Sequence, residues 1–323
     1  RQRQMCIRDS KRTHLSFSNK IGAFFVRRHI MHKAGFVNIV GNPNVGKSTL
    51  MNQLVGEKLS IATFKAQTTR HRIMGIVNTD DSQIVFSDTP GVLKPNYKMQ
   101  EMMLQFSESA LADADVLLYV TDVVENPEKN MDFLEKVAKM TIPVILLINK
   151  IDESDQSKLV ELVEKWHGLL PDAEILPISA KNKFGTDILM KRVRELLPES
   201  PAFFDKDQLT DKPARFFVSE IIREKILRYY DKEIPYSVEV VVERFKEDDR
   251  QIHINAVIYV ERSSQKGIII GHQGMALKKM STEARKSLER FFDKKIFLET
   301  FVKVDKDWRN SQKELNNFGY NPE

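Results

Sequence analysis

Residues 41–48 read Gly-Asn-Pro-Asn-Val-Gly-Lys-Ser, a spacing of glycines, lysine and serine that can hold a triphosphate. Gly41 and Gly46 let the chain curl tightly enough to direct several backbone N–H groups at one point. Lys47 supplies a positive charge for the β- and γ-phosphates, and the Ser48 hydroxyl can ligate Mg²⁺. The predicted phosphate contacts are Gly41, Asn42, Pro43, Asn44, Val45, Gly46, Lys47, Ser48 and Thr49.

A second polar group, Asp88-Thr89-Pro90-Gly91, ends the predicted strand that contains Ile84-Val85-Phe86. The Asp88 carboxylate can hold Mg²⁺ through a water molecule, and the Gly91 N–H can meet the γ-phosphate. These residue types also form ordinary turns. Their position about forty residues after the phosphate loop, at the end of a buried strand, favours nucleotide binding for Asp88, Thr89, Pro90 and Gly91.

Two later segments have the chemistry of a guanine pocket. Asp152 can accept hydrogen bonds from the N1–H and the exocyclic amine of guanine. Adenine offers neither group at that edge, so a buried carboxylate would be left unpaired against ATP, which is strongly disfavoured. We therefore predict GTP as the nucleotide. The predicted base contacts are Asn149, Lys150, Asp152, Ser179, Ala180 and Lys181.

Between the phosphate loop and Asp88 lies the polar stretch Gln67-Thr68-Thr69-Arg70-His71-Arg72. A threonine here can close over the γ-phosphate and complete Mg²⁺ coordination as a switch segment. We choose Thr69 for this role, with Thr68 as the alternative; in the GDP state the same stretch is a solvated loop. The two arginines are interpreted as surface charges rather than phosphate ligands.

The predicted metal ligands are Ser48, Thr69 and, through water, Asp88; the predicted catalytic groups are Lys47, Thr69 and Gly91. A Ras-like enzyme places a glutamine after its Asp-x-x-Gly to orient the attacking water. This chain has Val92 there, so the water must be oriented by backbone groups or by another part of the site, and we predict slow unaided hydrolysis.

Alternating elements position these residues. Strand candidates are 35–40, 73–78, 83–87, 115–121, 143–149 and 174–178, and helices are expected near 47–56, 99–112, 130–140, 155–168 and 186–197. This rhythm predicts an α/β domain over residues 31–197, with a doubly wound, mostly parallel sheet. The runs 73–78 and 83–87 are expected to pair as one antiparallel hairpin at its edge.

The pattern changes after residue 197. Three prolines among charged residues indicate a linker over 198–213. Beyond it we expect a helix near 215–230, strands at 236–245 and 251–260, a Gly-rich turn, a helix at 275–292 and a strand at 296–304. The predicted second domain is therefore α+β and spans 214–308, followed by a C-terminal tail over 309–323.

Composition narrows the class of protein. The 323 residues are 41% hydrophobic and 29% charged, as in a globular protein, and no apolar run is long enough to cross a bilayer. One cysteine, Cys6, cannot form an internal disulfide, which fits a reducing cytoplasm. The net charge of +5 comes from residues 1–30, where eight Lys or Arg face one acid, leaving −2 for the rest. That leader is expected to be non-native or disordered, with Met31 as the natural start and a transit peptide as the alternative.

The four nucleotide motifs, in this order, resemble those of the translation-factor-related GTPases, and Gln67-Thr68-Thr69-Arg70-His71 points to the Era family. Residues 267–274 read Gly-Ile-Ile-Ile-Gly-His-Gln-Gly and look like the signature loop of a type II KH domain, which clamps single-stranded RNA. The resemblance implies a P-loop G domain followed by that KH domain. It assigns RNA contacts to Lys266, Gly267, Gly271, His272, Gln273, Gly274, Lys278 and Lys279. Residues 262–295 carry nine basic residues against three acids, which suits phosphate neutralisation.

The resemblance also implies partners: GTP and GDP, the 3′ region of 16S rRNA and the 30S subunit whose assembly such proteins assist. It implies a cytoplasmic monomer with peripheral association with the inner face of the cell membrane. Mg²⁺ is the expected cofactor. Asn44 matches the asparagine by which related GTPases bind K⁺ beside the phosphates, so K⁺ is a hypothesis for a second ion.

Two other functions stay open at this point. One is a regulatory GTPase that acts at a membrane rather than on the ribosome, in which the basic helix expected at 275–292 binds anionic lipid. The Gly-x-x-Gly turn among those basic residues favours RNA instead. The other is an RNA-binding module with an inactive G domain, which the four intact nucleotide motifs disfavour.

Overall fold

The computed structural model describes residues 32–321, and the observations below concern that range. The leader predicted over residues 1–30 lies outside the described residues. No helix in the described range is both long enough and apolar enough to cross a membrane.

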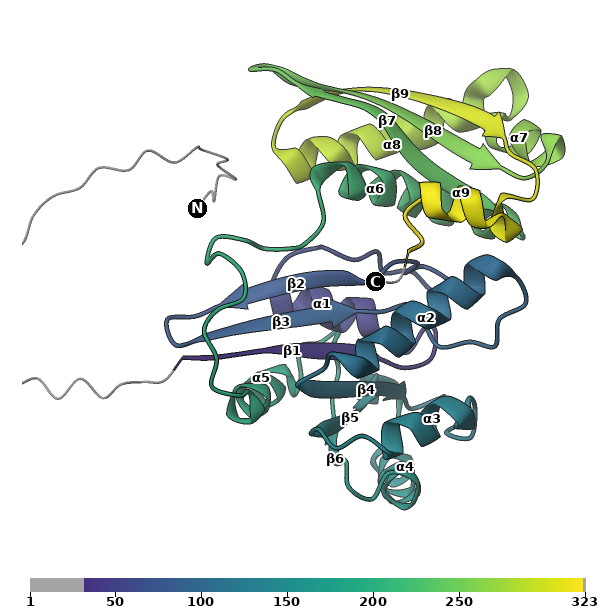
Figure 1. Ribbon diagram of the computed structural model, residues 1–323. Helices are drawn as coiled ribbons and strands as arrows, with labels where there is room; N and C mark the ends of the chain where they lie inside the picture. Colours follow the sequence, from purple (N-terminus) through teal and green to yellow (C-terminus); the bar gives the residue numbers. More distant parts are fainter. Residues whose placement is uncertain (1–31, 322–323) are drawn as a thin grey trace, which may run out of the picture. The chain divides into compact units, whose positions relative to one another are not determined.

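Six strands form the first sheet in the spatial order β2-β3-β1-β4-β5-β6 (Figure 1). All neighbouring pairs are parallel except β2 and β3, in which Ile73 lies opposite Asp88. The mostly parallel sheet and the antiparallel edge hairpin are thus confirmed. The strands are β1 (Lys33–Val40), β2 (Ile73–Asn78), β3 (Ser82–Asp88), β4 (Val116–Asp122), β5 (Val144–Asn149) and β6 (Glu174–Pro177).

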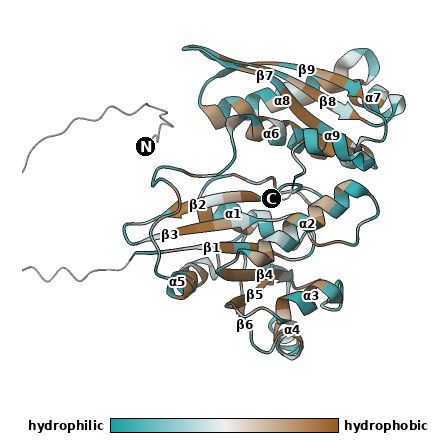
Figure 2. Cartoon of the chain, in the orientation of Figure 1, coloured by the Kyte–Doolittle hydropathy of each residue, from teal (hydrophilic) through white to brown (hydrophobic). Residues whose placement is uncertain are grey.

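Helices cover both faces of this sheet, which is why its central strands are mostly hydrophobic (Figure 2). In β4, Leu118 packs with α1 (Lys47–Val55) and α5 (Thr186–Leu196) on one face. The next residue, Tyr119, packs on the other face with α2 (Lys98–Ala112), α3 (Met131–Ala138) and α4 (Gln156–Leu169). The parallel strands end at one edge of the sheet, where the predicted nucleotide loops follow them.

The proline-containing segment 198–213 runs along the outer edge of β2 instead of simply separating two domains. Ile76 N donates to Leu209 O at 2.8 Å, and Thr210 Oγ1 donates to Met74 O at 2.6 Å. The Gln83 side chain also bonds to the backbone of Phe203 and Phe204. These contacts satisfy backbone groups that an edge strand would otherwise leave unpaired.

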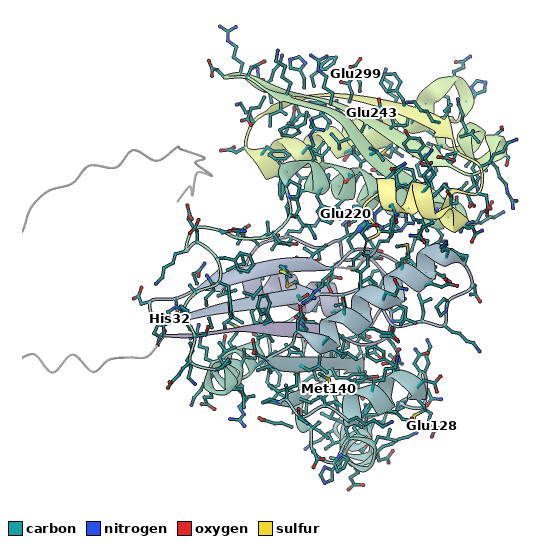
Figure 3. All side chains as sticks on the ribbon, viewed as in Figure 1. His32, Glu128, Met140, Glu220, Glu243 and Glu299 are labelled. Atoms are coloured by element: carbon teal, nitrogen blue, oxygen red, sulfur yellow. The ribbon has the colours of Figure 1, made fainter. Side chains whose placement is uncertain are left out.

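A second sheet follows, with the order β7-β8-β9. Strands β7 (Val238–Glu247) and β8 (Gln251–Val260) pair antiparallel, and β9 (Lys295–Val304) pairs parallel to β8. Helices α6 (Ala214–Tyr229), α7 (Ser263–Ile270) and α8 (Met275–Phe292) complete the unit. One face of the sheet buries a core with α6 and α8. By contrast, the side chains of Glu243 on β7 and Glu299 on β9 are exposed (Figure 3).

The C-terminal residues, predicted from the sequence as a tail, pack against the first domain. The short helical turn η4 (Trp308–Asn310), helix α9 (Gln312–Asn317) and the residues after them each bury one side chain fully: Trp308, Leu315 and Tyr320. They form a core with residues of α2 on the first sheet, including Met103. This segment therefore contributes to the folded structure.

Candidate nucleotide site and RNA-binding turn

The phosphate loop leaves β1 at Val40 and enters α1 at Lys47, so that the helix N-terminus faces the space inside the loop. Gly46 caps this helix with φ of 98°, in the left-handed region. A Cβ at Gly46 would lie 2.3 Å from Nδ2 of Asn149, so no larger residue fits there without movement. The same Asn149 nitrogen donates to Val45 O at 2.8 Å and so ties the base-recognition loop to the phosphate loop.

The ammonium group of Lys47 lies inside this loop. Its Nζ donates to Gly41 O at 3.0 Å and to Asn42 O at 2.8 Å, and only 6% of the residue is exposed. Burial lowers the pKa of Lys47 to about 8, although Asp88 and Glu125 oppose the shift. The charge is therefore held where the phosphates of a nucleotide would meet the loop amides.

Three oxygen-bearing side chains from separate segments converge beside Lys47. Ser48 Oγ lies 2.9 Å from Thr69 Oγ1, which donates to Asp88 Oδ2 at 3.3 Å. The other carboxylate oxygen, Oδ1 of Asp88, is buried without a hydrogen-bond partner in the described part of the chain. Burial raises the pKa of Asp88, and the charge of Lys47 opposes this. A cluster of hard oxygen donors with one free carboxylate oxygen fits Mg²⁺, and it contains Thr69, the threonine chosen from the sequence.

The segment after Asp88 passes next to the phosphate loop. Thr89 Oγ1 donates to Ile39 O at 2.8 Å, and Val92 N donates to Gly41 O at 3.1 Å. The Val92 side chain is only 4% exposed and packs in the hydrophobic core under α3. The Val92 side chain is therefore part of the core and, being apolar, offers no group that could orient a water molecule.

The two predicted base loops meet at the ends of β5 and β6. Asn149 Oδ1 accepts from Ala180 N at 3.0 Å, and Ser179 Oγ donates to Asp152 Oδ1 at 2.5 Å. Lys150 adopts φ of 62° and pairs with Asp122 at 2.5 Å. The argument for guanine assumed a buried carboxylate, whereas Asp152 is exposed in this structure, because it lies on a surface turn with one oxygen turned to Ser179.

In the second domain, the sequence pointed to residues 267–274 as the signature loop, with the turn itself at Gly271 and Gly274. In the structure Gly267 lies inside α7, and the turn spans Gly271–Gly274, with His272 and Gln273 exposed at its tip. Gly271 has φ of 69°, and a Cβ there would lie 2.6 Å from Cβ of Ala276. The turn therefore brings two helix ends close together.

The basic residues predicted beside this turn lie on the same helices. Lys278 and Lys279 are exposed in the first turns of α8, and Lys266 is half-buried on α7. The turn, its exposed tip and these cations form the surface that we call the KH turn. Its open backbone and positive charge suit a nucleic acid backbone.

Comparison with known proteins matches both domains. A family model described as a 50S ribosome-binding GTPase matches residues 36–150, and a KH domain model matches residues 233–309. The GTPase Era of Geotalea daltonii is 46% identical over 289 residues, which cover 89% of this chain and 97% of that protein. This chain belongs to the Era family of GTPases. The GTPase Era of Clostridium kluyveri is 44% identical over 90% of this chain and its own full length.

Two solved Era structures resemble this Era-family GTPase over both domains. One is a complex of Era with MgGDPNP and nucleotides 1506–1542 of 16S ribosomal RNA. Its TM-score is 0.86 at 37% identity, and the match covers 90% of this chain and 99% of that one. The other is an Aquifex aeolicus Era variant bound to GDP·AlF4−, with a TM-score of 0.85 at 38% identity and coverage of 89% and 99%.

The switch segment of this Era-family GTPase makes direct contact with the KH domain, and here the sequence interpretation of Arg70 was wrong. Arg70 is only 1% exposed. Its guanidinium donates to Val238 O at 2.6 Å, to Pro235 O at 3.1 Å and to Glu239 Oε2 at 3.1 Å. It is therefore an interdomain contact, and no local feature of the sequence distinguishes it from a surface arginine.

Arg72 is likewise not a surface charge, although it stays within the G domain. Its side chain is 12% exposed and pairs with Asp113 at 2.7 Å. It also donates to Ser87 Oγ at 2.6 Å and to Asn38 Oδ1 at 3.1 Å. These bonds join β1, β3 and the end of α2, so that Arg72 anchors the end of the switch segment to the sheet.

Further residues that the sequence did not single out hold the switch segment from the KH side. Arg223 on α6 donates to Thr68 O at 2.5 Å and pairs with Glu220 at 2.6 Å (Figure 3). The C-terminal Tyr320 donates to Glu239 at 2.6 Å, and burial together with Glu239 raises the pKa of this phenol well above its ordinary value. The rings of His71 and Tyr320 lie with their centres 4.5 Å apart at a tilt of 39°, and burial lowers the pKa of His71 to about 4.

Proposed function

We propose that this Era-family GTPase binds the 3′ region of 16S rRNA and assists assembly of the 30S ribosomal subunit as a nucleotide-controlled switch. The convergence of Ser48, Thr69 and Asp88 supports this most strongly, because the segment that carries Thr69 also carries Arg70 into the KH domain. Movement of Thr69 on loss of the γ-phosphate would thus be transmitted to the RNA-binding domain by the next residue, Arg70.

In this proposal the phosphate-loop amides and Lys47 hold GTP, and Ser48, Thr69 and Asp88 hold Mg²⁺, the last through water. Bound Mg²⁺ neutralises charge on the β- and γ-phosphates. Gly91 N–H faces the γ-phosphate, and the base loops around Asp152 read guanine. Loss of the γ-phosphate removes the bond that keeps Thr69 closed, and the switch segment relaxes.

The KH turn is proposed to clamp single-stranded RNA through Gly271 and Gly274, with His272 and Gln273 at its tip and Lys266, Lys278 and Lys279 on the phosphates. The Era structure solved with nucleotides 1506–1542 of 16S rRNA supports this RNA as the partner. We propose that the protein acts as a monomer in the cytoplasm, with peripheral association with the cell membrane.

The RNA assignment is tested by crosslinking and sequencing RNA bound in cells by the wild type and by Gly274→Asp. Gly274 caps α8 with φ of 76°, and no atom lies within 4 Å of an added Cβ. Aspartate tolerates this backbone region and caps helices well, so the domain should stay folded while the new charge repels RNA phosphates. We expect loss of most 16S crosslinks.

The matched control is Gly56→Asp, which also has positive φ and open space around the added Cβ, at the end of α1. It should retain the 16S crosslinks. Recovery of the same fragments by Gly274→Asp would show that the KH turn is not the clamp. Recovery of RNA fragments from the large ribosomal subunit alone would show that 16S rRNA is not the partner.

A bound K⁺ is proposed beside Asn44. This residue is exposed on the phosphate loop with φ of 68°, which leaves its side chain free of the loop interior. Because Val92 cannot orient water, we propose that a monovalent cation supplies positive charge at the transition state. We expect turnover of GTP to be several-fold faster in KCl than in NaCl at equal ionic strength, and Asn44→Ala should remove the difference. Equal rates in both salts would contradict the proposal.

A further inference from the structure

Phe64 is the most exposed large apolar side chain among the described residues, with a relative exposure of 101%. It lies in the loop 60–66 that leads from α1 into the switch segment. The loop itself is ordered, because Thr63 Oγ1 lies 2.8 Å from Thr68 Oγ1, and Lys65 O accepts from Thr68 at 2.5 Å. The phenyl ring therefore faces solvent from a fixed loop and contributes nothing to the core.

The loop that carries Phe64 lies close to the KH turn. Lys65 Nζ donates to Tyr230 O at 2.6 Å, and the hydroxyl of the same Tyr230 donates to Ile269 O at 2.8 Å. Ile269 is two residues before Gly271. A single tyrosine residue thus connects the switch loop with the beginning of the KH turn, a separation that a few nucleotides of single-stranded RNA can cross.

An aromatic ring and several cations lie between the two. Tyr229, at the end of α6, is 41% exposed, and Lys279 Nζ lies 5.4 Å from the centre of its ring. Lys58 and Arg228 both pair with the buried carboxylate of Glu224, at 2.8 and 2.5 Å, while their own side chains stay more than half exposed. Lys65 pairs with Asp231, whose side chain is 86% exposed. The Lys65–Asp231 pair lies at the surface, so it contributes little energy and can exchange for a phosphate contact. Lys58 and Arg228 present their exposed cations while they remain paired with Glu224.

We propose that RNA held at the KH turn continues past Tyr229 onto the switch loop, where one base stacks on Tyr229 and another on Phe64. Single, separated aromatic rings among cations are typical of single-stranded RNA sites, in which bases stack on the rings and phosphates pair with the cations. A protein partner would require a contiguous apolar patch instead. This inference rests on the proposed RNA-binding function and extends it to a second contact, in the G domain.

The consequence is that RNA touches the segment that leads directly into Thr68 and Thr69. A base stacked on Phe64 would hold this loop in the arrangement described above, in which Thr69 reaches Ser48, and would so favour the closed position that hydrolysis requires. RNA long enough to reach Phe64 is therefore expected to stimulate GTP turnover, whereas RNA confined to the KH turn is not.

The test measures affinity of the full chain for an RNA with the sequence of nucleotides 1506–1542 of 16S rRNA, and for versions shortened from either end. For Phe64→Ala and for Tyr229→Leu we expect about tenfold weaker binding of the long RNA, in line with the energy of one stacked base. We expect unchanged binding of the shortest RNA that still occupies the KH turn. RNA stimulation of turnover should be lost in Phe64→Ala, while GDP affinity stays as in the wild type.

Phe184→Ala is the matched control, because Phe184 is a similarly exposed phenylalanine (61%) on the base-recognition side of the G domain. It should bind both RNAs normally. Phe64→Trp should show quenched emission when the long RNA is added. Wild-type affinity of Phe64→Ala for every RNA, with no quenching in Phe64→Trp, would overturn the inference while leaving the KH turn intact. Binding of no RNA by the wild type, or undiminished binding by Gly274→Asp, would instead refute the proposed function.

Discussion

Replacement of Lys47 by alanine is expected to reduce GTP turnover by about 100-fold or more, the usual cost of removing one preorganised group that stabilises transition-state charge. The ammonium lies on the carbonyls of Gly41 and Asn42, so it is already oriented toward the phosphates. Its burial opposes the charged form, so its removal should not unfold the protein. Single-turnover hydrolysis with a thermal unfolding control measures both quantities.

The matched control is Lys33→Ala. Lys33 Nζ also donates to two backbone carbonyls, those of Arg194 and Glu195 at 3.2 and 2.8 Å, but it does so at the start of β1, outside the nucleotide site. It should turn over GTP at the wild-type rate. Calorimetry adds a second check, since the heat of binding a non-hydrolysable GTP analogue should fall sharply in Lys47→Ala only. Wild-type turnover in Lys47→Ala would show that the phosphate loop is not the site of hydrolysis.

Replacement of Arg70 by alanine should destabilise the protein strongly and weaken the connection between nucleotide and RNA. The Arg70 and Glu239 side chains are 1% and 8% exposed. Removing one partner of a buried ion pair leaves the other charge uncompensated, at a cost of about 3–5 kcal/mol. Denaturant unfolding measures this loss. RNA affinity should also cease to differ between the GDP and GTP-analogue states, because Arg70 links Thr69 to β7.

Two variants separate the ion pair from a general packing defect. Arg70→Met combined with Glu239→Gln removes both charges and keeps the side-chain volumes, so most of the stability should return while the nucleotide dependence of RNA binding stays lost. Arg192→Ala removes an exposed arginine that pairs with Glu174 and Glu195, and should change stability little. If Arg70→Ala were as stable as Arg192→Ala, the buried interdomain pair would not be an important contact.

Local sequence was enough to predict that the nucleotide loops lie together at one edge of the first sheet. Each of its loops follows a strand of the same mostly parallel sheet, and such strands end at one edge. Gly46, Lys47 and Ser48 belong to one short loop, so their spacing in the sequence is enough to predict a phosphate-binding loop. The exposed position of Asp152 could not be predicted, because exposure depends on how its turn meets the loop around Ser179.

Local sequence by itself predicted most of the helices and strands, the phosphate loop and the Gly271–Gly274 turn, since each depends on residues within a few positions of one another. Only the tertiary structure decided that Arg70 is buried under the KH domain, that segment 198–213 covers the edge of β2, and that Tyr320 packs beside His71. These contacts join residues more than 100 positions apart in the chain. The residues next to such a side chain in the sequence do not reveal its partner, because the partner depends on how the two complete domains pack together.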